Sequence, residues 1–381
     1  MKYWVVPIYL LLGATIGAAQ STSAADLYRA AGQSVPKRTS PAEEFVWQDV
    51  FDAPLDKPAN DILKRAGESL ELFDSSSKMA FGEWGFNSED PMAGAILLNG
   101  GEDLAGLVVL RARLRMARGD YAGALDDSFN IAQLARRLSV EPSLMRQRQQ
   151  TVIFEKAMQL AASMVIDAPP EFLAHFVDRL SELRSPIDPV ELAKATQKSY
   201  ISFYRGLIAS PRWRSMAPDM GKPLNEMFGL PGTRIDVNDL AADAELADAV
   251  FAQAQSAADE MIAALHAAGG ERDAAMVIIP TRYRATHPLV RGACDLVVLT
   301  HRLDRSEAAI EKMLKKAVEI SAHQPIDPEA ARKAAGEFQY SKSPGGFDLK
   351  YVLFGNPTPT ILHVGPRPLR SPAQPATMSF P

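Results

Sequence analysis

The sequence predicts a mostly α-helical protein in which helical hairpins pack as an irregular, partly solenoid-like body, with a small C-terminal antiparallel β-hairpin. Two amphipathic helical patterns meet at Gly119-Asp120 within residues 104–138, where a glycine ends one helix and an aspartate caps the next. Similar apolar periodicity recurs between prolines and glycines along most of the chain. After residue 336 the pattern changes to an alternation of aromatic and polar residues, which is typical of strands.

Residues 1–25 resemble a secretory signal peptide. Lys2 precedes an apolar run from Tyr3 to Ala19, and small residues follow it. Two cleavage positions fit, one after Ala19 and one after Ala25. An uncleaved membrane anchor is the alternative, because the run approaches spanning length. We therefore expect an exported protein, periplasmic or extracellular, without a transmembrane segment after cleavage.

Composition limits the kind of protein further. The chain has 381 residues, of which 47% are hydrophobic, so it can build a large apolar core. Cys294 is the only cysteine, so no disulfide can form within one chain, and its apolar neighbours predict a buried thiol. The formal net charge of −5 argues against nucleic acid as the principal partner.

The chain divides into successive segments. Residues 26–58 predict an irregular N-terminal arm. It begins with a short helical candidate at 26–32, and a stretch with four prolines follows, whose aromatic middle packs onto the body. Residues 59–335 predict a helical domain, interrupted by a long loop at 210–237 that is rich in proline and glycine. Within that domain the helices are expected at 59–73, in the 104–138 hairpin, and at 143–166, 169–183, 189–209, 238–268, 289–304 and 306–322.

The C-terminal part predicts a small sheet followed by a tail. Residues 336–366 form the expected β-hairpin segment, with Tyr340 before and Phe347 after the turn at Pro344-Gly345-Gly346. Residues 360–364 are a candidate third strand. Residues 367–381 predict a disordered tail.

Residues 108–138 resemble a tetratricopeptide hairpin, since Gly119, Tyr121 and Ala124 match the glycine, aromatic and alanine positions of that repeat. Arg111 and Arg115 depart from the pattern, and the chain has no second convincing copy. The resemblance implies one repeat-like hairpin and no ordered array.

Two wider resemblances concern the loop before this hairpin and the C-terminus. EWGFNSEDP followed by the Gly-Asp hairpin is similar to a group of exported bacterial helical proteins of unassigned function. The terminal stretch 325–355 resembles the end of pseudopilin-type sequences. The N-terminal methylated phenylalanine helix of pseudopilins is missing, so filament assembly is not implied. Neither resemblance supplies catalytic residues.

Known catalytic and metal-binding motifs do not occur in the sequence. It has no HExxH, GxSxG, Walker-type, Rossmann or calcium-loop motif, and none of the six histidines lies three to five residues from another. The sequence therefore predicts no catalytic residue, no metal site and no cofactor.

The loop at 84–90 is the first candidate ligand site. Trp84 and Phe86 provide rings for stacking, and Glu89 and Asp90 provide carboxylates that accept hydrogen bonds. The alternative, which we favour, is that the aromatic residues anchor the loop to the helical body.

Two basic clusters are further candidates. Arg111, Arg115 and Arg118 lie at helical spacing, and we expect them to pair with nearby aspartates on a solvated face. The stretch TRYRATHP is the strongest candidate for a polar ligand site, because its polar residues lie close together just before a helix. These residues are Arg282, Tyr283, Arg284 and His287. The alternative is that it is only a polar connector between two helices.

The sequence favours an exported, non-catalytic helical interaction or scaffold protein of the cell envelope, whose partner would be an envelope protein or a peptide. The second hypothesis is an envelope enzyme of the hydrolase type with an anion-binding site near 282–287. A third links the C-terminal hairpin to secretion machinery.

Overall fold

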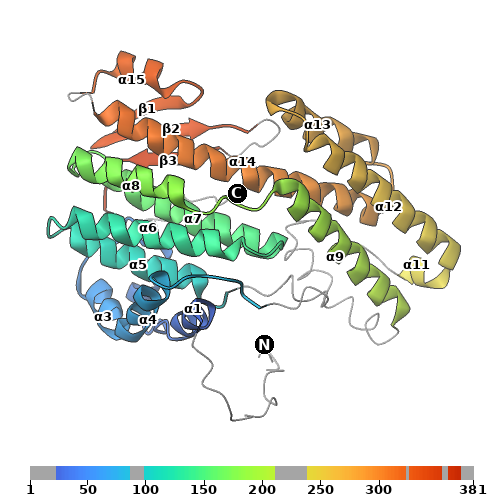
Figure 1. The fold of residues 1–381 in the computed structure, drawn as a ribbon, viewed down its shortest axis with the longest axis horizontal. Coiled ribbons are helices and arrows are strands. Elements are labelled where there is room, and N and C mark those ends of the chain that lie inside the picture. Colours follow the sequence, from blue (N-terminus) through green and yellow to red (C-terminus); the bar gives the residue numbers. More distant parts are fainter. Residues whose placement is uncertain (1–22, 86–97, 211–237, 323–325, 354–358, 370–381) are drawn as a thin grey trace, which may run out of the picture.

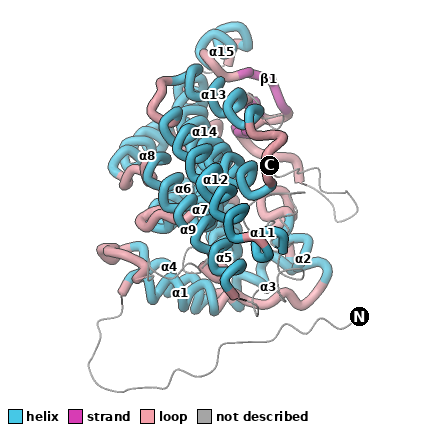
Figure 2. Tube along the Cα trace, turned by 90° about the vertical axis from the view of Figure 1, so that its right-hand side faces the viewer, coloured by secondary structure: helices cyan, strands magenta, loops and turns pink. Residues whose placement is uncertain are grey.

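Helices make up most of the structure, and a three-stranded antiparallel sheet stands near the C-terminus (Figure 1). The computed structural model describes residues 23–85, 98–210, 238–322, 326–353 and 359–369. The predicted fold class is confirmed. The tube view in Figure 2 shows strand only at one end of an otherwise helical molecule.

The first group of helices builds the N-terminal part. Its members are α1 (Ala24–Gln33), α2 (Pro41–Gln48), α3 (Lys57–Arg65), α4 (Gly67–Ser77), α5 (Gly101–Met116), α6 (Tyr121–Leu138), α7 (Leu144–Met164) and α8 (Pro170–Glu182).

The predicted hairpin at 104–138 corresponds to α5 and α6, which pack against each other and against α7. Gly119 adopts φ +79°, a conformation that favours glycine, and so allows the sharp turn after α5. The Asp120 carboxylate then accepts a hydrogen bond from the Gly123 N–H at 2.9 Å and caps α6. The local signals in the sequence are therefore the ones that form this turn.

The second group lies at the other end of the molecule and consists of α9 (Pro189–Ala209), α11 (Asn238–Ala242), α12 (Ala244–Ala264) and α13 (Gly269–Arg282). The long helix α14 (Pro288–Ser321) runs across the molecule and contacts both groups (Figure 1). The short helix α15 (Pro328–Ala335) leads into the sheet.

Two apolar cores result from this arrangement. The first core joins the N-terminal helices, the C-terminal half of α14 and the inner face of the sheet. The second core joins α9, α11, α12 and α13 to the N-terminal half of α14. Cys294 lies in the second core and is buried, as predicted. One continuous helix thus contributes to both cores.

A polar layer separates the two cores, and we use this name for the buried polar residues of α6, α7 and α14 at their boundary. On α14 it includes Thr300, His301 and Glu307, which are at most 2% exposed. The Glu307 carboxylate pairs with Arg136 of α6 and accepts hydrogen bonds from Gln147 and Gln150 of α7, the second at 2.6 Å. Each buried charge in this group therefore has a partner, as burial requires.

The sheet has the order β1 (Gln339–Ser343), β2 (Gly346–Tyr351) and β3 (Thr360–Val364). Tyr340 pairs with Leu349 and Lys342 with Phe347, so these four side chains share one face. That face contacts the first core. Gly346 is needed at the turn, because an added Cβ would lie 1.9 Å from the Val364 carbonyl oxygen.

The free edge of β3 is closed by one glutamine of α7. The Gln159 side chain donates to the His363 carbonyl at 2.6 Å and accepts from the His363 N–H at 3.2 Å. These are the two bonds that a neighbouring strand would make. An amide side chain therefore occupies the edge that could otherwise pair with another chain.

Several expected boundaries differ from the structure. In the 26–58 arm the short helix expected at 26–32 is part of α1, and a second helix that the sequence did not predict, α2, is capped by Ser40. The helix expected at 59–73 is two helices that meet at Ala66-Gly67. The helices expected at 289–304 and 306–322 are the single helix α14. Sequence reasoning missed α13 and α15.

Other predicted segments lie wholly or partly outside the described residues. They are the signal segment up to residue 22, residues 211–237 of the long loop, and residues 370–381 of the tail. Of the tail, Arg367 is described, and its guanidinium lies 3.7 Å from Asp52. Among the helices that are described, none combines the length and apolar character needed to cross a bilayer.

Candidate functional site

Trp84, the central residue of the first candidate site, belongs to the core. Its side chain is 2% exposed and packs against the rings of Tyr28 and Phe81. The indole N–H donates to the Arg137 carbonyl at 2.7 Å, and the Trp84 backbone N–H donates to Glu141 at 2.9 Å. The ring therefore anchors its loop to the body, as the favoured interpretation expected. Phe86, Glu89 and Asp90 lie outside the described residues.

The second candidate site lies where α13 ends and α14 begins. Arg282 pairs with Glu260 of α12, and the Tyr283 hydroxyl donates to the same carboxylate at 2.7 Å. That hydrogen bond, with burial and the charge of Glu260, raises the pKa of Tyr283 to about 12. Two of the four predicted residues are therefore engaged by one glutamate.

The other two residues of this cluster do not complete a site. The His287 Nδ1 accepts a hydrogen bond from the Leu289 N–H at 3.1 Å and so caps α14, while burial lowers the pKa of its imidazole. Arg284 is exposed. The arrangement resembles the polar connector that was the alternative interpretation, because its members serve helix ends and an ion pair.

The arginines of α5 are less exposed than we expected. Arg111 bridges Asp74 of α4 at 2.8 Å and Asp127 of α6 at 2.5 Å, and Arg115 reaches Asp127 at 2.9 Å. Asp127 is 1% exposed, so the pairing with an aspartate is correct but the solvated face is wrong. These charges fix α5 to its neighbours.

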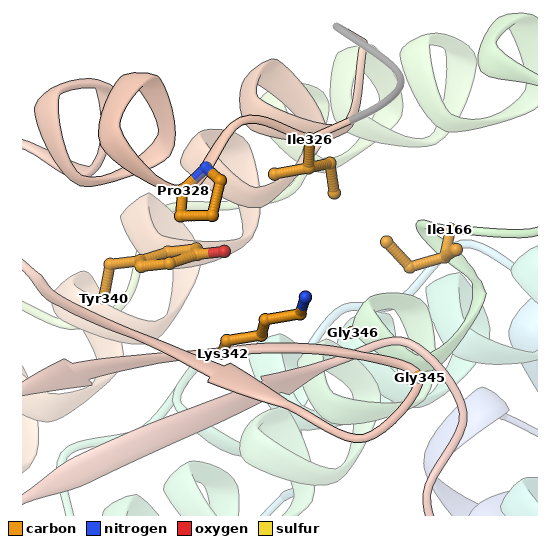
Figure 3. Close-up of a pocket in the computed structure, with 7 residues that line it drawn as sticks. All are labelled: Ile166, Ile326, Pro328, Tyr340, Lys342, Gly345 and Gly346. Carbon is orange, nitrogen blue, oxygen red and sulfur yellow. The ribbon is translucent and has the colours of Figure 1, made fainter.

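A pocket of about 200 Å³ lies between the sheet and the end of the helical body (Figure 3). Tyr340 and Lys342 of β1 form one wall, and Gly345 and Gly346 of the turn lie beside them. Apolar side chains form the opposite wall: Ile166 after α7, and Ile326 and Pro328 before and at the start of α15. We call this the hairpin pocket.

The polar ends of Tyr340 and Lys342 point into the hairpin pocket (Figure 3). Within the described ranges, neither the phenol oxygen nor the ammonium has a hydrogen-bond or ion-pair partner. Burial raises the pKa of Tyr340, so its hydroxyl keeps its proton and can donate. Two donors therefore face a small space whose far wall is apolar.

Sequence reasoning placed Tyr340 on a strand but did not select it or Lys342 as site residues. The only local signal was a lysine on the same face as core residues of the strand. An inward charge on an edge strand also discourages pairing between sheets, so that signal alone does not identify a site.

Metal-binding and redox-active groupings are not seen in the described part of the chain. No group of three or more histidine, cysteine, aspartate or glutamate residues is placed to hold an ion there. Burial raises the pKa of Cys294 to about 12, so its thiol stays protonated and unreactive. The hairpin pocket therefore offers binding groups, and its visible chemistry is hydrogen bonding and charge.

Comparison with protein-family models, with curated proteins and with solved structures finds no match for this chain.

Proposed function

We propose that the protein is an exported, non-catalytic helical interaction protein of the cell envelope, which binds a peptide or an envelope protein. The observation that carries this proposal is the hairpin pocket, where two hydrogen-bond donors that have no partner among the described residues face an apolar wall. Convergent polar groups within an apolar cavity are the usual form of a binding site.

The use of charge elsewhere supports the same proposal. Arg137 donates to the carbonyls of Ser76, Ser77 and Met79 and to the Tyr28 hydroxyl. Glu307 is held by one arginine and two glutamines. These buried groups stabilise helix packing, and they are not free for chemistry on a substrate.

The alternative of an envelope hydrolase receives less support. Its natural anion site was Arg282, Tyr283, Arg284 and His287, but Glu260 already neutralises part of this cluster and His287 caps a helix. The third hypothesis, a role of the hairpin in secretion machinery, has no observation of its own, since Phe347 and Leu349 place the hairpin in the first core.

Partner capture with matched variants tests the proposal. The full-length protein is cross-linked in envelope extract, together with the variants Lys342→Met and Lys350→Met. Lys350 lies on β2 at a position that alternates to the opposite face from Leu349, so it is the same residue type outside the pocket. We expect a specific partner to be captured by the wild type and by Lys350→Met, and its yield to fall at least about tenfold with Lys342→Met.

Absence of any specific partner would contradict the interaction function. Equal capture by both lysine variants would contradict the use of the hairpin pocket. Both lysines lie outside the apolar cores, so unchanged thermal unfolding of each variant is the control for folding.

A further inference from the structure

The two walls of the hairpin pocket have different chemistry. On one wall the Tyr340 hydroxyl and the Lys342 ammonium converge from alternate positions of β1 (Figure 3). The Tyr340 ring is fixed by the Phe347 ring, with centroids 5.4 Å apart, so its hydroxyl is held in place. On the opposite wall Ile166, Ile326 and Pro328 offer only apolar surface. A ligand that complements both walls carries a hydrogen-bond acceptor or an anion on one side and apolar surface on the other.

The volume restricts the ligand further. About 200 Å³ is less than the roughly 300–1,000 Å³ of pockets that enclose a drug-sized molecule. The space suits one residue of a longer chain, with the remainder outside. An anchoring residue in a small pocket is a common arrangement in peptide recognition.

The charge around the pocket favours an anion. Lys342 contributes a positive charge at the wall, and Arg332 of α15 also acts on Tyr340. Asp327 is the nearby carboxylate that acts on Tyr340, and it is engaged as the cap of α15, accepting from the Glu329 and Ala330 N–H groups. One ammonium and one hydroxyl match a single carboxylate.

We propose that the hairpin pocket binds the C-terminal residue of a partner polypeptide, taking its free carboxylate on Tyr340 and Lys342 and its apolar side chain on Ile166, Ile326 and Pro328. The proposal rests on the interaction function proposed above, and it names the chemical class of the partner segment.

A chain terminus fits better than an internal acidic residue. The C-terminal residue carries its carboxylate and its side chain on the same Cα, so both walls can be contacted within one residue. An aspartate or glutamate side chain places its charge at the end of the group that enters the pocket, so a second residue would have to reach the apolar wall. Capture of a terminal carboxylate is an established mode of peptide recognition.

Fluorescence anisotropy with short labelled peptides tests this inference on the full-length protein. Three hexapeptides are compared: one that ends in leucine with a free carboxylate, the same peptide with a C-terminal amide, and an amidated peptide with an internal glutamate. We expect the free acid to bind at least about tenfold more tightly than either other peptide, since a charge-assisted hydrogen bond is lost without it. Lys342→Met should weaken binding of the acid about tenfold and Tyr340→Phe several-fold, while Lys350→Met leaves it unchanged.

Equal affinity of acid and amide would overturn the proposed ligand class, and so would unchanged binding by Lys342→Met. Tighter binding of the internal-glutamate peptide would assign the pocket to acidic side chains and overturn the terminal assignment. If these peptides fail while partner capture still depends on Lys342, the ligand class is wrong and the interaction function stands. If the free-acid peptide binds but no partner is captured, the ligand class stands and the proposed interaction function is wrong.

Discussion

A buried histidine faces a carboxylate at the boundary between the two cores. His301 of α14 is 2% exposed, and its Nε2 lies 2.8 Å from the Asp273 carboxylate of α13. Burial lowers the pKa of His301 below its ordinary value of 6.5, although Asp273 acts in the opposite direction and Arg272 and Arg305 add to the lowering. The imidazole is therefore neutral in the folded protein at pH 7.

This histidine predicts a loss of stability in mild acid. A lowered pKa in the folded state means that the contribution of His301 is complete above pH 6.5 and is lost as the pH falls below it, because the unfolded chain binds the proton more readily. The slope for one proton is at most about 1.4 kcal/mol per pH unit. Urea unfolding at pH 7.5 and 5.5 should show a smaller pH difference for His301→Gln than for the wild type. The exposed His175→Gln variant is the control, and an identical pH difference in all three proteins would refute the prediction.

Single side chains also explain why residue types alone were poor guides to a site. Tryptophan and arginine are common in binding surfaces, yet here both side chains are buried and make internal hydrogen bonds. The Trp84 indole donates to the Arg137 carbonyl, and the Arg137 guanidinium donates to the Ser76 carbonyl. Lys342, in contrast, belongs to no motif or cluster that the sequence indicates as a site. The role proposed for it depends on Ile166 and Ile326, which lie far from Lys342 in the sequence and line the same pocket only in the folded chain.

Under the proposed export, the first helix favours one of the two candidate cleavage positions. Ser23 caps α1 through a capping box, since its side chain accepts from the Asp26 N–H at 3.1 Å and the Asp26 carboxylate accepts from the Ser23 N–H at 3.3 Å. Ala24 and Ala25 are each 3% exposed. Cleavage after Ala25 would remove the cap and these buried residues, whereas cleavage after Ala19 would keep them.

We therefore predict that, if the protein is exported as proposed, its exported form begins at Gln20. The intact mass or the N-terminal sequence of the exported form measures this directly. A chain that begins at Asp26 should also be less stable than one that begins at Gln20, by about 1 kcal/mol or more, because it lacks the cap. An exported form that begins at Asp26, with equal stability of the two chains, would disprove the argument.

At the scale of elements, helix type was predictable and helix continuity was not. Ser143 and Asp188 stand at the starts of two predicted helices, and the side chain of each accepts a hydrogen bond from the first turn of its helix. A new helix was also expected to begin at Ser306, but α14 continues through this position. The Ser306 hydroxyl instead lies 3.2 Å from that of Thr360 in β3, and Glu307 joins the polar layer, so both residues serve tertiary contacts.

The helix α13 was also missed because tertiary contacts, and not the local sequence, decide where it begins. Gly269-Gly270 was interpreted as a helix end, yet α13 begins at Gly269. Glycine permits both a stop and the unusual entry angle seen here, where Gly269 has φ +47°. Only the packing of α13 against α12 and α14 decides between the two.

For the whole molecule, the polar layer predicts strong dependence on Glu307. Its carboxylate links α14 to Arg136 of α6 and to two glutamines of α7. Glu307→Ala should lower the free energy of unfolding by about 3–5 kcal/mol, since it leaves buried donors and a guanidinium without this partner. Chemical denaturation measures the difference.

The matched control is Glu319→Ala, which removes a glutamate from the same helix. Glu319 pairs with Lys316 at an exposed position, so its loss should cost less than about 1 kcal/mol. A Glu307→Ala effect no larger than that of Glu319→Ala would show that the polar layer does not stabilise the packing of α14 against α6 and α7.

Because α14 is one unbroken helix of 34 residues, it extends about 50 Å. The hairpin pocket lies past its C-terminal end, and the connector at 282–287 lies at its N-terminal end. A continuous helix of this length fixes the distance between the hairpin pocket and the 282–287 connector, because no loop interrupts it. If the hairpin pocket holds the terminus of a partner polypeptide, a second molecule that binds at the 282–287 connector would lie at a fixed distance from that terminus.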